Sequence, residues 1–354
     1  MPVSARFPRL ALLAGVLTAV LFGATTVPAG AEDVESRTAF TFTDRAITES
    51  SGLVVRGPLA FTINDSGDGP LLYSVNKTTG DTVATTTYSS DTVEDVEAIA
   101  PGLGGDIWVG DIGDNREERT SITVYRTVPL GGLRQQRNAP KGDDEKIEES
   151  VEAEKFDLVY PDSAHDAETL LVHPVTGRLY VVTKAVTGGT VYAAPETLDP
   201  PSANRLEDVG DVPGLVTDGA FLPDGEHILL RSYGRAAIYT FPELRLVGPL
   251  DLPSQQQGEG VAVDPSGGVY LSSEGSFSEV LEILLPTEVT DALDDPALDE
   301  ALPTRPPVEP DIPATEPVST ADGAVLWVAL GAVAVVLAGG LAVTVARRRS
   351  RRRW

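Results

Sequence analysis

The chain has 354 residues, no cysteine, and 53 acidic against 27 basic residues, for a formal net charge of −26. The lack of cysteine excludes disulfides, thiol catalysis and thiolate metal sites, and three histidines leave little room for a zinc centre. All the acidic residues lie between Glu32 and Asp322. A field of that sign repels nucleic acid and attracts divalent cations, so no nucleic-acid partner is expected.

The first 31 residues have the composition of a secretory signal peptide. Arg6 and Arg9 precede an apolar run over residues 10–22, and Ala29, Gly30 and Ala31 form a small-residue cleavage site. The alternative is an uncleaved membrane anchor. The apolar run is short for a membrane span, so we expect cleavage after residue 31.

The exported chain opens with a short alternating segment, residues 38–43. Phe40 and Phe42 fall on one face and threonines on the other, which predicts a half-buried strand. No partner strand lies nearby in the sequence.

A β-hairpin pattern then recurs five times. Each copy has an acidic or polar residue, an apolar strand, a turn with Pro or Gly, and a second apolar strand with a polar end. The clearest copy covers residues 165–184. Corresponding first-strand positions are Ser51, Glu97, Glu168, Asp218 and Glu259. A hairpin recurring at intervals of roughly 40 to 50 residues, with one longer gap, predicts an all-β propeller with one hairpin in each blade.

The segments between the hairpins leave room for two outer strands in each blade. The long second interval contains a polar stretch, residues 131–151, that we interpret as a surface loop. After the fifth hairpin only one further strand, residues 280–285, is evident. The segment 38–43 therefore completes the last blade and closes the ring. This count favours five blades over residues 32–285. Six blades are the alternative, with one blade hidden in the long interval.

The C-terminal part predicts a membrane-anchored protein. Residues 286–323 are rich in Pro and acidic residues and read as an extended stalk. Residues 324–346 carry no charge and are long enough to cross a bilayer as a transmembrane helix. Six arginines follow in the tail 347–354, which the positive-inside rule keeps cytoplasmic. We therefore expect a single-pass protein of the cell membrane with its propeller outside the cell.

Acidic residues are expected to gather on one face of the ring. In a hairpin, the start of the first strand and the end of the second share one sheet edge. Carboxylates around one axis suit Ca²⁺, which prefers oxygen ligands. The predicted ligands are Asp65, Asp111, Glu97, Glu168, Asp218 and Glu259. The alternative is that these carboxylates accept hydrogen bonds from backbone N–H groups and brace neighbouring blades.

Two basic residues at the ends of second strands, Lys184 and Arg231, are candidates for binding an anion such as phosphate. The alternative is that they neutralise neighbouring carboxylates. His165 lies on the same face, but no nucleophile motif accompanies it.

Residues 49–53, 64–69 and 108–115 resemble secreted actinobacterial β-propeller proteins, and more distantly the phytase-like propeller family. The resemblance covers about residues 49–285. Phytases of that architecture have six blades and use calcium with several basic residues, whereas here five blades are favoured and only Lys184, Arg231 and Arg235 are available. The resemblance therefore implies calcium but not the reaction. We expect a surface-displayed binding module for a protein or small-molecule ligand; the alternative is a calcium-dependent hydrolase of phosphoesterase or esterase type.

Overall fold

A computed structural model describes residues 34–65, 68–89, 91–129 and 146–293. The predicted signal peptide, the transmembrane segment and the basic tail lie outside these residues and stay predictions. Within the described part of the chain, no helix is both long and apolar enough to span a bilayer.

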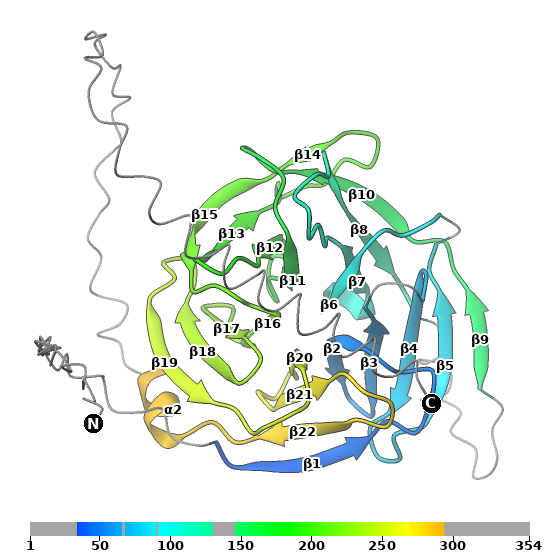
Figure 1. Cartoon of the computed structure of the whole chain (residues 1–354), viewed down its shortest axis with the longest axis vertical. Coiled ribbons are helices and arrows are strands. Elements are labelled where there is room, and N and C mark those ends of the chain that lie inside the picture. The colour runs from blue at the N-terminus through cyan, green and yellow to red at the C-terminus, as the bar shows by residue number, and fades with distance from the viewer. Residues whose placement is uncertain (1–33, 66–67, 90, 130–145, 294–354) are drawn as a thin grey trace, which may run out of the picture. The chain divides into compact units, whose positions relative to one another are not determined.

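Five sheets, each one a blade, are arranged around a ring (Figure 1). The innermost strands are β2 (Ser50–Arg56), β6 (Val96–Pro101), β11 (Ala167–Val172), β16 (Asp218–Phe221) and β20 (Gly258–Val263). Their hairpin partners are β3 (Leu59–Asn64), β7 (Ile107–Asp111), β12 (Leu179–Thr183), β17 (His227–Arg231) and β21 (Val269–Ser273). All five predicted hairpins are therefore confirmed.

The outer strands complete the blades. The third strands are β4 (Leu71–Asn76), β8 (Ile122–Thr127), β13 (Gly189–Ala193), β18 (Arg235–Thr240) and β22 (Glu279–Ile283). The fourth strands are β5 (Thr82–Thr87), β10 (Glu154–Val159), β15 (Glu207–Val212) and β19 (Leu246–Asp251). In the last blade the N-terminal strand β1 (Ser36–Thr41) takes the fourth place.

Ring closure follows the prediction from the surplus strand. β1 pairs antiparallel with β22, so the first and the last strand of the described chain share one blade. Phe40 and Phe42 are buried with their ring centroids 5.5 Å apart, in a core that includes Tyr270 and Val280. The first strand is thus held both by a ladder of backbone hydrogen bonds and by an apolar core.

The long second interval contains no sixth blade among the described residues. Its end forms β9 (Ile147–Ser150), which pairs parallel with β5 of the first blade. The prediction of a loop over residues 131–151 is wrong for these residues, because Ile147 is half-buried and Thr86 Oγ1 donates a hydrogen bond to Glu149. A two-residue strand, β14 (Asn204–Arg205), pairs parallel with β10.

The blades approach closely around the central channel because the innermost strands carry small residues. A Cβ placed on Gly52 would lie 2.6 Å from the Ile99 nitrogen of the next blade. One placed on Gly260 would lie 3.0 Å from the Ser51 carbonyl oxygen of the first blade. Side chains larger than hydrogen at these two positions would push the strands apart.

Past the last blade, a short helix α2 (Thr287–Leu293) stands where the stalk was predicted to begin. Val289 is buried against Gly248 of β19, where a Cβ would lie 2.8 Å from Val289 Cγ2. The packed part of the chain therefore extends beyond the predicted boundary at residue 285.

Deleting β1 should destabilise the entire ring, because the last blade loses its fourth strand and exposes Val280 and Tyr270. We expect one cooperative thermal transition at a lower melting temperature (Tm), measured by circular dichroism. Arg37→Ala, which removes only the exposed ion pair with Glu282, is the control and should cost less than about 1 kcal/mol. An unchanged Tm after the deletion would show that β1 does not close the ring.

Candidate functional site

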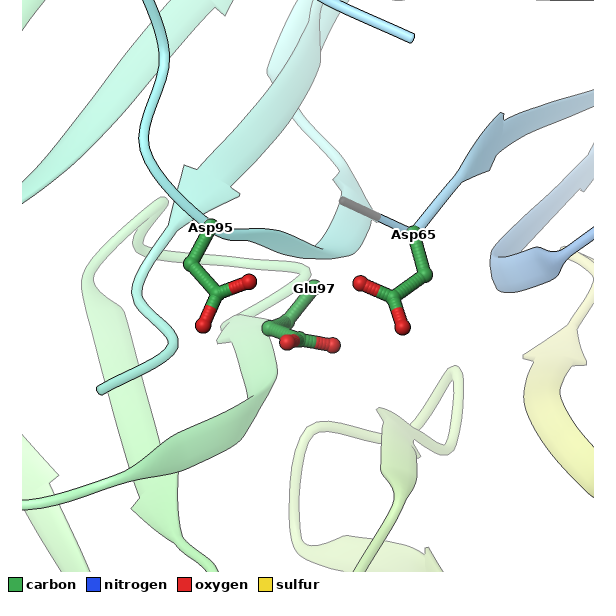
Figure 2. Close-up of side chains that lie close together, drawn as sticks. All are labelled: Asp65, Asp95 and Glu97. Carbon is green, nitrogen blue, oxygen red and sulfur yellow. The ribbon is translucent and has the colours of Figure 1, made fainter. Parts of the chain in front are cut away.

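Three carboxylates from the first two blades meet near the axis of the ring. Asp65 directly follows β3, Asp95 directly precedes β6, and Glu97 lies within β6. One carboxylate oxygen from each lies within 4.8 Å of the other two. Figure 2 shows the three side chains pointing toward a common space. We call these three residues the acidic triad.

Glu97 is the most buried member, with 6% of its surface exposed. Among the described residues, none donates a hydrogen bond to its carboxylate or forms an ion pair with it. Burial raises the pKa of Glu97 to about 10, and the charges of Asp65, Glu168 and Asp95 add to this rise. Burial, together with the charge of Asp65, also raises the pKa of Asp95. Among the described residues, no Lys or Arg pairs with the Glu97 carboxylate, whereas Arg119 and Asn115 partly offset the rise at Asp95.

Gly113 brings backbone against the triad from the loop after β7. A Cβ at this position would lie 2.5 Å from Asp95 Oδ2 and 2.8 Å from Glu97 Oε1. Only glycine leaves this space open. Three carboxylates, of which Glu97 is buried and has no partner among the described residues, and the open space beside them fit a divalent cation that prefers oxygen, as Ca²⁺ does.

Asp111, a predicted ligand, accepts hydrogen bonds from backbone N–H groups instead. Its Oδ1 accepts from the Asp95 N–H at 3.0 Å and from Arg119 at 2.9 Å, while Oδ2 accepts from the Glu94 N–H at 3.0 Å. Both oxygens are thus engaged. Asn64 occupies the equivalent place in the first blade, where its Oδ1 accepts from the N–H groups of residues 48 and 49. Asp111 therefore positions Asp95, and the triad does not include it.

Asp218 and Arg231 also brace the ring. Asp218 is fully buried, and its two oxygens accept from the N–H groups of Gly219 at 2.8 Å and Val261 at 2.7 Å. Arg231 is 1% exposed and donates to the carbonyls of Gly260 and Ser272. Neither side chain has the access to solvent that the predicted cation and anion roles require.

Glu168 and Glu259 form a second acidic group around Lys184. Glu168 accepts a hydrogen bond from Lys184, whose ammonium also donates to the Tyr233 hydroxyl at 3.2 Å. Burial raises the pKa of Glu168 to about 7 although Lys184 opposes the rise. Burial and the charge of Glu274 raise the pKa of Glu259 to about 7, again against Lys184. Lys184 therefore neutralises carboxylates, which was the alternative to anion binding.

The three histidines lie outside the triad. His165 Nε2 lies 3.1 Å from both Asp162 and the Tyr192 hydroxyl, and its ring stacks on Tyr192. Asp95 was not among the ligands predicted from the sequence. The signal available was its spacing of two from Glu97, which puts both side chains on one face of a strand.

No protein-family model matches the chain, and no curated protein matches it. Among solved structures, a gluconolactonase from Xanthomonas campestris is 12% identical, with a TM-score of 0.41 over 72% of this chain and 87% of that one. Two structures of glucose dehydrogenase are 10% and 11% identical, with TM-scores of 0.39 and 0.37. They cover 68% of this chain and 84% and 83% of their own. These likenesses are distant ones between β-propellers, and they assign no family and no activity.

The raised carboxyl pKa values predict how stability depends on pH. For Glu97, Glu168 and Glu259 the pKa in the folded chain lies above the usual glutamate value of 4.5, so the folded state holds more protons than the unfolded state. Their contribution to stability is present at low pH and is lost as pH rises, through about 7 for Glu168 and Glu259 and through about 10 for Glu97. We expect the Tm in chelator to fall between about pH 5 and about pH 8.

Glu259→Gln should flatten this profile, whereas Glu118→Gln on the exposed loop should leave it unchanged. If the Tm in chelator rises over the same pH interval, the pKa values of these carboxyls are not raised in the folded chain.

Proposed function

We propose that this propeller is a binding module that holds Ca²⁺ in the acidic triad and recognises its ligand at that face. The observation that carries the proposal is the meeting of Asp65, Asp95 and Glu97, with Glu97 buried and unpartnered among the described residues. Ca²⁺ takes six to eight oxygen ligands, and three carboxylates leave positions for water and for oxygen atoms of a ligand.

The charges around the acidic triad favour a bound cation over a purely structural role for its carboxylates. Bracing carboxylates such as Asp218 have backbone N–H donors for both oxygens. The Glu97 carboxyl has neighbours of its own sign, so protonation or a bound cation must relieve the repulsion. An extracellular site needs only weak affinity, with a dissociation constant (Kd) on the order of 10⁻⁴–10⁻³ M.

A calcium-dependent hydrolase is the second candidate, and Glu168 favours it. Its pKa of about 7 suits a general base near neutral pH, and the charges of Glu168 and the triad act on each other across the channel. Hydrolysis of model phosphate esters or carboxylic esters that is lost with chelator and with Glu168→Gln would favour this candidate over a binding module.

The proposal also places the propeller outside the cell, from the signal-peptide and span patterns of residues 1–31 and 324–346. Calcium is available there at the concentration that a weak site needs. Protease added to intact cells should release the propeller; its protection in intact cells would contradict this location.

Calcium should raise the Tm of the wild-type chain by mass action. At about 100 times Kd the gain is about 2.7 kcal/mol, and each kcal/mol raises the Tm of a domain of this size by about 2–4 °C. Glu97→Gln and Gly113→Ala should abolish the calcium response, because one removes a ligand and the other fills the cradle.

Asp111→Asn is the matched control. It should lower the Tm, because backbone donors and Arg119 lose a charged acceptor, yet it should keep a calcium response. Equal Tm values for the wild type in calcium, magnesium and chelator would overturn the proposal.

A further inference from the structure

The opposite end of the channel holds a cavity of about 370 Å³ that the triad does not reach. The C-terminal parts of all five innermost strands line it, whereas Glu97 stands near the start of β6. Pro101 at the end of β6 and the turn residues Pro174, Pro223 and Pro265 contribute to its wall. The proline turns that recur through the sequence therefore surround the end of the axis remote from the carboxylates. We call this space the apolar axial cavity.

Its wall carries almost no polar side chain. Among the described residues that line it, Arg56 and Asp264 are the two charged ones, and both form hydrogen bonds with neighbouring backbone groups. Arg56 donates to the Gly102 carbonyl at 3.0 Å, and Asp264 Oδ1 accepts from the N–H groups of Ser266 and Gly268 at 2.8 and 2.9 Å. The remaining lining residues are aliphatic, proline, glycine and one phenylalanine. A charged ligand would lose its hydration here without gaining a partner of opposite charge.

The backbone still offers hydrogen bonds to a neutral polar group. Each innermost strand is the terminal strand of its sheet, so one row of its N–H and C=O groups lies outside the ladder. A single hydroxyl or carbonyl on the ligand can use these groups. The wall thus favours a molecule that is mainly apolar, neutral and equipped with few polar atoms.

The size of the cavity sets a further limit. Apolar cavities of roughly 150 Å³ bind benzene, and ligand pockets begin at about 300 Å³. Three lining residues of a strand, such as residues 99–101 of β6, span about 10 Å. These dimensions suit a short aliphatic chain.

We propose that the chain binds a neutral, mainly aliphatic small molecule in the apolar axial cavity, at a site separate from the acidic triad. All five innermost strands contribute apolar side chains to this site, and the prolines that line it fix the backbone at its entrance.

Trp108 provides a reporter for occupancy. A Cβ placed on Gly102, which lines the cavity, would lie 3.0 Å from the indole nitrogen of Trp108. The sequence contains three tryptophans. Replacing Trp327 and Trp354 by Phe in the full chain leaves Trp108 as the single tryptophan.

The experiment titrates this chain with 1-octanol and, in parallel, with octanoate, which has the same chain length and a charge. We expect 1-octanol to change Trp108 emission along a saturable curve, with the same Kd in calcium and in chelator. Octanoate should bind at least about tenfold more weakly, because its carboxylate must be desolvated. Lack of saturable binding of 1-octanol, or equal affinity for octanoate, would overturn the proposal.

A variant locates the site. Ala220 lines the cavity and is only half-buried, so Ala220→Phe places a ring in the ligand's space and should weaken 1-octanol binding by about tenfold or more. Val186→Phe, at an 83% exposed position in the loop after β12, should leave binding unchanged. Unaltered binding in a folded Ala220→Phe chain would contradict the assignment. If that chain does not fold, the comparison of 1-octanol with octanoate in the wild-type chain still tests whether a neutral aliphatic molecule binds.

Discussion

Ring closure forces the starts of five innermost strands to one axis, and their acidic side chains converge with them. The pairing of β1 with β22 completes the last blade, and small residues such as Gly52 and Gly260 let neighbouring strands come close. Like charges held together in this way are unfavourable unless they are protonated, paired or neutralised. The chemistry of the acidic face therefore depends on whether each carboxylate is protonated, paired or neutralised.

For most of these carboxylates, a hydrogen-bond donor or a Lys side chain offsets the repulsion. Asp111 and Asp218 accept backbone N–H groups, and Glu168 pairs with Lys184. Glu97 differs, since it is buried among like charges and none of the described residues pairs with its carboxyl. Like charges do not meet at the other end of the axis, where the described residues of the innermost strands are mainly aliphatic. The channel is thus divided into an ionisable end and an apolar end.

The architecture could be predicted from the sequence because its signals are local. Alternating apolar residues and Pro or Gly turns mark each hairpin, and one surplus strand marks the closure. The strand β9 could not be predicted, because residues 147–150 are stabilised by pairing with β5, far away in the sequence. The pattern placed Asp111 at the edge where the acidic residues gather. It did not show that backbone N–H groups engage Asp111, or that Asp95 faces Asp65 and Glu97.

The most direct test of the cation site is a crystal structure grown with Mn²⁺, a divalent cation that binds oxygen ligands and scatters anomalously. The account predicts an anomalous peak bound to one oxygen each of Asp65, Asp95 and Glu97, with Gly113 beside it. Density that shows these three carboxyls hydrogen-bonded to one another or to water, with no anomalous peak between them, would contradict it.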